Sequence, residues 1–261
     1  LAGGRALFNL CMSRPEPIPF FGELGSVNPM FCLPKAMQTR AGALAQGWAA
    51  SLTMGAGQFC TNPGIAFVIA GAQANEFAEA SIAALSGAGA QAMLTDGIAS
   101  AYRHGTNAVA SAAHVEPLFT TESVGRTALP NLFRVSLEHW LHSPDLQEEV
   151  FGPLGIIVEA NDIDEMVAAA GAIEGQLTCT LQMEDGDKAH AQRLLPHLER
   201  KAGRVLVNGF PTGVEVAGAM VHGGPYPAST NFGATSVGTM AIRRFLRPVC
   251  YQNMPADLLP A

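Results

Sequence analysis

The sequence is poor in charge, and the charge that it has is mostly acidic. Only 14% of the 261 residues are charged, against about 25% in an average globular domain. The net charge of −7 argues against a nucleic-acid-binding protein, which would carry a basic face. The sequence also has no run of 18 apolar residues, so we expect no membrane span. Because 48% of the residues are hydrophobic, we expect surface that is covered by another subunit or by a missing part of the same protein. A homo-oligomer, either a dimer or a tetramer, is therefore predicted.

Paired cysteine motifs are absent as well. The five cysteines are an odd number, and no two of them form a C-x-x-C pair, so neither a zinc site nor a disulfide framework is indicated. No metal is predicted. Residues 1–5 contain no apolar core of a signal peptide. Free thiols and the lack of a targeting segment favour the cytoplasm, which is reducing. The cysteines are Cys11, Cys32, Cys60, Cys179 and Cys250.

What the sequence does have is an unusual loop around Cys60, in the stretch GAGQFCTNPG from Gly55 to Gly64. Gly55 and Gly57 allow the backbone to adopt positive φ or to approach a ligand closely. Pro63 has no backbone donor and favours an extended conformation for the residue before it. Such a loop holds one side chain in a fixed place. A free cysteine often packs as a small hydrophobe, whereas a reactive one needs an accessible, electropositive setting. The loop alone leaves both interpretations open.

Strand-like and helix-like segments alternate along the chain, and this order predicts an α/β fold with a largely parallel sheet flanked by helices. Helices are predicted over 4–13, 34–54, 75–85, 97–113, 163–170, 187–200 and 236–246, with another beginning within 144–149. Strands are predicted over 18–21, 65–70, 131–135, 154–158, 177–183 and 203–208. Residues 114–130 look like a loop. Residues 248–253 are predicted to be an exposed last strand that pairs across subunits, or else a disordered terminus.

Three further side chains are notable for their surroundings. Glu23 lies between two glycines just after an apolar run, so it is either a solvated turn residue or a buried functional carboxylate. His222 lies in the Gly/Pro loop 221–227, where it either lines a pocket or caps a turn. His139 and His142 share helical spacing, but no third ligand accompanies them, which favours a surface face over a metal site.

Three motifs together suggest a family. The stretches GELG at 22–25, GQFC at 57–60 and EVFGP at 149–153, in this order and at these separations, resemble the aldehyde dehydrogenase superfamily. The wider stretches FFGELGSVNP, QFCTNPG and VHGGPYP are most similar to one branch of it. That branch contains the 2,5-dioxopentanoate (α-ketoglutaric semialdehyde) dehydrogenases and the NADP-dependent fatty-aldehyde dehydrogenases. One departure is Ser26, where the family usually has a second glycine.

The resemblance also implies that sequence is missing. Family members carry most of a Rossmann-like coenzyme domain upstream of the glutamate, with an Asn that helps to hold the oxyanion and a Lys that contacts the adenosine ribose. Residues 1–261 contain none of this, so the chain resembles the C-terminal half of such an enzyme. Residues 1–25 would then be a remnant of the coenzyme domain, 26–240 the catalytic domain, and 241–261 an oligomerisation tail.

The family's chemistry transfers to particular residues. By resemblance, the Cys60 thiolate attacks an aldehyde, hydride passes to NAD or NADP, and Glu23 activates the water that hydrolyses the thioester, a role that calls for a raised carboxyl pKa. The Cys60 backbone N–H would help to hold the oxyanion. The predicted cofactor contacts are Glu149, Phe151 and Leu24. The predicted substrate-pocket residues are Gln58, Phe59, Thr61 and His222.

Two other functions stay open at this point. One is a thiol hydrolase with a Cys–His pair, which needs a histidine that a third group orients; no histidine in the sequence has a recognisable partner motif. The other is a non-catalytic module or incompetent fragment that self-associates.

Overall fold

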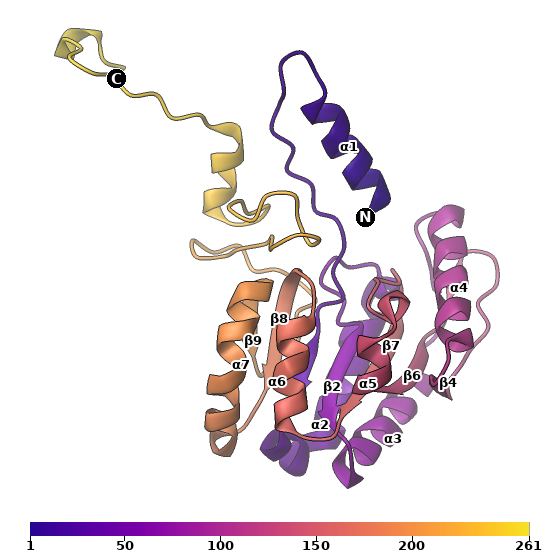
Figure 1. Cartoon of the computed structure of the whole chain (residues 1–261). Helices are drawn as coiled ribbons and strands as arrows, with labels where there is room; N and C mark the ends of the chain where they lie inside the picture. Colours follow the sequence, from indigo (N-terminus) through magenta and orange to yellow (C-terminus); the bar gives the residue numbers. More distant parts are fainter. Residues whose placement is uncertain (261) are drawn as a thin grey trace.

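A seven-stranded sheet forms the centre of the molecule in the computed structural model, which describes residues 1–260 (Figure 1). The strand order is β4-β6-β7-β2-β1-β8-β9, and every neighbouring pair is parallel except β4 with β6. A two-stranded antiparallel ribbon joins β3 to β5. The strands are β1 (Met30–Cys32), β2 (Ile65–Ile69), β3 (Gln91–Ala92), β4 (Glu116–Phe119), β5 (Thr127–Ala128), β6 (Asn131–Ser136), β7 (Leu154–Ala160), β8 (Gln176–Gln182) and β9 (Ala202–Val207).

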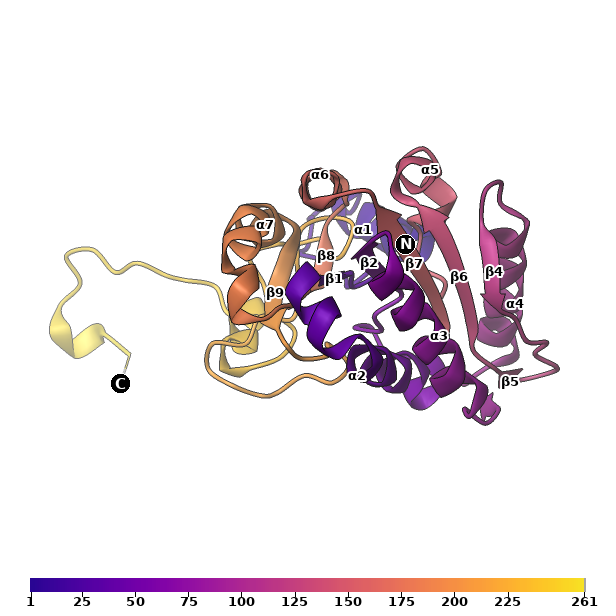
Figure 2. The same ribbon diagram turned by 90° about the horizontal axis from the view of Figure 1, so that it is seen from below.

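Helices cover both faces of this sheet, as Figure 2 shows in the view from below. The α-helices are α1 (Ala2–Met12), α2 (Pro34–Thr53), α3 (Ala72–Ser86), α4 (Asp96–Ser111), α5 (Leu137–Leu141), α6 (Ile163–Ala172) and α7 (Lys188–Lys201). The 3-10 helices are η1 (Met54–Gly57), η2 (Pro144–Leu146), η3 (Asp185–Asp187), η4 (Thr239–Phe245) and η5 (Ala256–Leu258). Helices α2 and α3 pack together on one face, and α5, α6 and α7 lie on the other. The result is the layered α/β arrangement that the alternating segments predict.

Each face of the sheet has its own apolar core. Trp48 of α2 stacks on Phe77 of α3, with ring centroids 5.4 Å apart, over one face. On the other face, Phe67 of β2 stacks on Phe31 of β1 at 4.8 Å. Because β1 and β2 are buried on both faces, their sequences are continuously apolar rather than alternating.

The start of α2 depends on a distant carboxylate. Pro34 occupies the first turn, where its missing N–H costs nothing. The two oxygens of the fully buried Asp187 accept hydrogen bonds from the backbone N–H groups of Lys35 and Ala36, at 2.9 and 3.0 Å. The other end of α2 runs into the Cys60 loop, so this capping also fixes the helix that delivers the loop.

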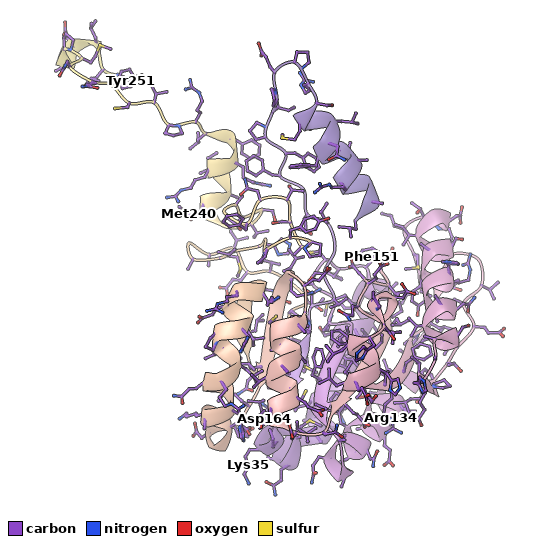
Figure 3. All side chains as sticks on the ribbon, viewed as in Figure 1. Lys35, Arg134, Phe151, Asp164, Met240 and Tyr251 are labelled. Atoms are coloured by element: carbon purple, nitrogen blue, oxygen red, sulfur yellow. The ribbon has the colours of Figure 1, made fainter. Side chains whose placement is uncertain are left out.

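The residues that the sequence singles out lie at the amino ends of the parallel strands. Glu23 precedes β1, Cys60 precedes β2 and Glu149 precedes β7. In Figure 3, Phe151 lies at this end of the sheet, toward α1, whereas Lys35 and Asp164 lie at the opposite end. Open α/β sheets usually bind ligands at the carboxyl ends of their strands, so this placement departs from the common rule.

Some predicted elements are wrong. Residues 18–21 form no strand, because Pro17 and Pro19 supply no backbone donors for a ladder. Residues 248–253 are exposed and have no neighbouring strand within residues 1–260, so their pairing across subunits stays a prediction. Residues 144–149 and 236–246 contain only the short 3-10 helices η2 and η4. The segment 114–130, predicted as a loop, contains β4 and β5.

Within residues 1–260, no helix combines the length and the apolar character that a membrane crossing demands.

Candidate active site

A tight turn presents Cys60 between α2 and β2. Gly57 adopts φ +66°, and a Cβ there would lie 2.3 Å from the carbonyl carbon of Gly152. Only glycine fits both the conformation and the close approach. Farther along, the indole Nε1 of Trp48 donates to the carbonyl of Pro63 at 2.7 Å. The loop is therefore fixed on both sides of the half-buried Cys60.

The buried side-chain amide of Asn28 holds the same loop through hydrogen bonds. Asn28, fully buried and at φ +48°, donates through Nδ2 to the carbonyls of Cys60 and Asn62 at 2.9 and 3.0 Å. Its own backbone N–H donates to Oε1 of Gln176 at 3.1 Å, and Ser26 Oγ donates to the same oxygen at 2.9 Å. The sequence analysis missed Asn28 and Gln176. The nearest signal was the position of Asn28 two residues after the GELGS stretch.

The side chains of Cys60, His222 and Glu23 come together beside this hydrogen-bond network. Nε2 of His222 lies 3.3 Å from Sγ of Cys60 and 2.9 Å from Oε2 of Glu23. The carbonyl of Ala228 accepts from the N–H of Leu24 at 2.9 Å and thereby positions Glu23. The backbone N–H of His222 donates to Oγ1 of Thr235 at 2.8 Å. The His222 side chain is only 5% exposed, so the imidazole has little freedom to leave its two partners.

The contacts with Cys60 and Glu23 give His222 a more central role in the site than the sequence indicated. The loop 221–227 left open whether His222 caps a turn or lines a pocket, and the histidine showed no recognisable partner. In the structure it bridges the sulfur of Cys60 and the carboxylate of Glu23. The arrangement has the elements of an activated nucleophile: a thiol, an imidazole within hydrogen-bond reach and a third group that orients the imidazole.

The close contacts within this cluster shift the pKa values of His222 and Glu23 in opposite directions. Hydrogen bonds to Cys60 and to Glu23 raise the pKa of His222 to about 9, although burial opposes the rise. The same contact with His222 holds the pKa of Glu23 below its usual range. At neutral pH, a positively charged imidazolium therefore lies against both the sulfur and a carboxylate. The raised pKa that the sequence analysis assigned to Glu23 is wrong here, because His222 stabilises its ionised form.

Arg204 is a second cation that interacts electrostatically with Cys60. Arg204 of β9 is half-buried and donates to the carbonyls of Pro211 and Gly213 at 2.7 and 3.2 Å. Burial lowers the pKa of Arg204, and its interaction with Cys60 partly opposes that change. The sequence gave no sign of this residue's role, because it lies 144 positions after Cys60.

A cavity of about 320 Å³ opens on the other side of Glu23. Cys60, Glu149, Phe151 and Leu24 line it, so it joins the predicted nucleophile to the three predicted cofactor contacts. Burial raises the pKa of Glu149 to about 7, and the charge of Glu23 acts in the same direction. A half-buried carboxyl group beside a partly exposed phenyl ring suits a ligand that carries both hydroxyl groups and a flat ring.

The remaining predicted pocket residues have mixed surroundings. The amide of Gln58 is used within the protein: Oε1 accepts from the N–H of Leu94 at 2.8 Å, and Nε2 donates to the Gly55 carbonyl at 3.0 Å. Phe59 packs toward Gly55. Thr61 is fully buried, and its Oγ1 has no hydrogen-bond partner within residues 1–260. Their roles at a substrate stay predictions.

The sulfur, imidazole and carboxylate also form a potential ligand set for a cation. The three atoms of Cys60, His222 and Glu23 all lie within 4.8 Å of one another. Thiolate and imidazole are the ligands that Zn²⁺ prefers. By contrast, His139 and His142 bond locally: Nδ1 of His139 contacts Ser136 Oγ at 2.7 Å, and Nδ1 of His142 contacts the Glu138 carbonyl at 2.7 Å.

Comparison with known proteins places this site in context. No family model matches the sequence. The chain is 49% identical to α-ketoglutaric semialdehyde dehydrogenase 2 of Azospirillum brasilense, over 99% of this chain and 50% of that protein. It thus spans about half the length of the curated relatives that it matches.

Solved structures share the fold. A γ-glutamyl-γ-aminobutyraldehyde dehydrogenase from Burkholderia cenocepacia superposes with a TM-score of 0.76 at 20% identity, over 93% of this chain and 48% of its own. The glyceraldehyde-3-phosphate dehydrogenase GapN of Methanocaldococcus jannaschii, solved with NADP, gives a TM-score of 0.70 at 18% identity, over 86% and 48%. At these identities, the likeness shows a common architecture.

Proposed function

Because the chain belongs to the aldehyde dehydrogenase superfamily, we propose that it carries the nucleophile of an enzyme that oxidises an aldehyde to a carboxylic acid with NAD or NADP. The observation that carries the proposal is the contact of His222 with both Cys60 and Glu23. The substrate that the curated relatives' names support is a semialdehyde; a fatty aldehyde is the alternative that the sequence motifs allow.

In the first step, the sulfur of Cys60 attacks the aldehyde carbon. A C–S bond forms, and the carbonyl π electrons move to the oxygen, which gives the oxyanion of a hemithioacetal. Before the attack, the imidazolium of His222, which lies 3.3 Å from the sulfur and 2.9 Å from Glu23, places a positive charge beside the attacking atom. The backbone N–H of Cys60 is the candidate donor to the developing oxyanion.

The cavity beside Cys60 fits the nicotinamide end of the cofactor. Its 320 Å³ volume, the half-buried carboxyl of Glu149 and the ring of Phe151 match a ligand with ribose hydroxyls and a flat ring. Glu149 would accept hydrogen bonds from the hydroxyls, while Phe151 and Leu24 would pack against the ring. When bound, NAD or NADP supplies the acceptor for the hydride that leaves the hemithioacetal carbon, and a thioester on Cys60 is the product.

Hydrolysis of the thioester needs a base, and acylation itself supplies one. Once the sulfur is acylated it carries no negative charge, so His222 loses the partner whose hydrogen bond contributes most to its raised pKa. Its proton then becomes easier to release. With Glu23 still 2.9 Å away, the pair can accept the proton of a water molecule that attacks the thioester. Release of the acid returns the electron pair of the C–S bond to the sulfur.

The proposal is tested by following reduced nicotinamide while an aldehyde is added, in parallel with mass spectrometry of the peptide that contains Cys60. In an enzyme that combines this chain with a coenzyme domain, we expect aldehyde-dependent reduction of NAD or NADP, together with an acyl adduct on Cys60 that accumulates in Glu23→Gln and is absent in Cys60→Ser. Both proteins must keep the wild-type circular dichroism spectrum. An unchanged rate in Cys60→Ser would refute the assignment of the nucleophile.

A second function is favoured by the same contact, namely cofactor-independent hydrolysis of esters by the Cys60–His222 pair. The third group that such a hydrolase needs to orient its histidine is present as Glu23. Acylation of the sulfur by an ester leads to the same thioester without a hydride acceptor. Turnover of a nitrophenyl ester without NAD or NADP, lost in Cys60→Ser, would establish this activity. Strict nicotinamide dependence of all turnover would exclude it.

A further inference from the structure

A second hollow lies on the side of Glu23 and His222 away from Glu149. Its narrow inner part, about 30 Å³, is lined by Glu23, His222 and Arg244. Beyond it, a wider cavity of about 320 Å³ is lined by Arg243 and Arg244 together with small and apolar residues. The two parts share Arg244, so one guanidinium borders both the wider cavity and the pair Glu23 and His222. Cys60 lines neither part, and its sulfur lies 3.3 Å from Nε2 of His222.

The wider cavity has an uncompensated positive charge. It contains two arginines and no acidic residue among the side chains that line it. Within residues 1–260, neither Arg243 nor Arg244 takes part in an ion pair. The side chain of Arg244 makes one long hydrogen bond, from Nε to the Ala241 carbonyl at 3.4 Å, and lies 5.4 Å from the ring of Phe245. Its terminal N–H groups remain available for a ligand.

We propose that Arg244, assisted by Arg243, binds the carboxylate of a semialdehyde whose aldehyde end reaches Cys60. Arginine presents parallel N–H donors that match a carboxylate, which makes it suited to this role. Glu23 and His222 compensate each other's charge at the inner end, so the arginines give the hollow its net charge and orient the substrate with its carboxylate outward. The apolar lining suits the short carbon chain between the two ends. This inference rests on the proposed function, and it assigns the residue that selects the substrate class.

The test compares two aldehydes of equal carbon number on the 261-residue chain. Succinic semialdehyde carries a carboxylate and butanal does not. Each forms a reversible hemithioacetal and thereby protects Cys60 from iodoacetamide, which peptide mapping measures without any cofactor. We expect succinic semialdehyde to protect Cys60 at concentrations about tenfold lower than butanal, a ratio that corresponds to about 1.4 kcal/mol.

Variants separate charge recognition from a general effect on folding. Arg244→Met should abolish the preference for succinic semialdehyde and leave protection by butanal unchanged, while Arg244→Lys should restore part of it. Arg247→Met, on an exposed residue that follows η4 and lines neither part of the hollow, is the matched control and should keep the full preference. If Arg244→Met is misfolded, Arg243→Met serves instead and should reduce the preference.

The possible failures are distinguishable. Equal protection by both aldehydes in the unmodified chain, or an unchanged preference in Arg244→Met, overturns the inference and leaves the proposed function standing. Absence of protection by either aldehyde refutes the addition of aldehydes to Cys60, and with it both the proposed function and the inference.

Discussion

Glu149 should make the stability of the protein depend on pH in a direction opposite to that of an ordinary carboxylate. Burial raises its pKa to about 7 from the usual 4.5. The folded protein therefore binds this proton more tightly than the unfolded chain does, and the free energy of unfolding falls as the pH rises from 4.5 through about 7. At about 1.36 kcal/mol for each pKa unit, the loss is about 3 kcal/mol.

The change Glu149→Gln should remove this loss. The amide is close in shape to the neutral acid and cannot ionise, so the variant should gain about 3 kcal/mol relative to wild type between about pH 4.5 and pH 8.5. Urea unfolding at both pH values, followed by the fluorescence of the buried Trp48 and Trp140, measures this difference. His222 loses its own stabilising effect as the pH rises from 6.5 through about 9, but it does so equally in both proteins.

The control is Glu148→Gln, which removes a charge from the exposed neighbouring residue. It should shift stability by the same small amount at both pH values. If the difference between Glu149→Gln and wild type is the same at low and high pH, folding does not raise the pKa of Glu149, and the account of its burial is refuted.

Three other outcomes are expected. Gly57→Ala should lose at least about 1–3 kcal/mol of stability in urea unfolding, since φ +66° and the contact with Gly152 both oppose a Cβ; an unchanged midpoint would contradict the loop geometry. Asn28→Ala should cost about 3 kcal/mol or more by the same assay, because two buried carbonyls lose their donor. Iodoacetamide should label Cys60 faster than the buried Cys32, and Zn²⁺ should slow that labelling; if Zn²⁺ has no effect, the three ligand atoms do not converge as described.

Elements with a strong local pattern could be predicted from the sequence. Helix α2 begins at a proline and is rich in alanine, and β2 is a continuous β-branched and aromatic run, so both were identified within one residue of their bounds. Strand β1 was missed because three residues carry no periodicity. It exists because β2 and β8 pair with it on either side, a feature of the folded sheet that no local pattern reports.

The residues of the site likewise divide into those that local motifs indicate and those that only the fold brings together. Cys60 and Glu23 could be proposed because short motifs surround them, and Glu149 because it begins another. The contact between His222 and Cys60 joins residues 162 positions apart, and the hydrogen bond from Asn28 to Gln176 joins residues 148 apart. Neither has a local signature. The assembled structure also reversed the expected direction of the Glu23 pKa, since that direction depends on which side chain the fold brings against the carboxylate.

The position of the reactive groups at the amino ends of the strands has a consequence for how the protein folds. The loop that holds Cys60 is fixed by Asn28 and Gln176, and their hydrogen bonds exist only when β1 and β8 lie side by side. Pairing strands so far apart in the chain is slow, because loop closure must precede any gain from contact. Helix α2 and the turn at Gly57 can form early, but the nucleophile acquires its final surroundings late. The rate at which a thiol reagent labels Cys60 therefore reports when the sheet is complete. This rate should rise in the last kinetic phase of refolding.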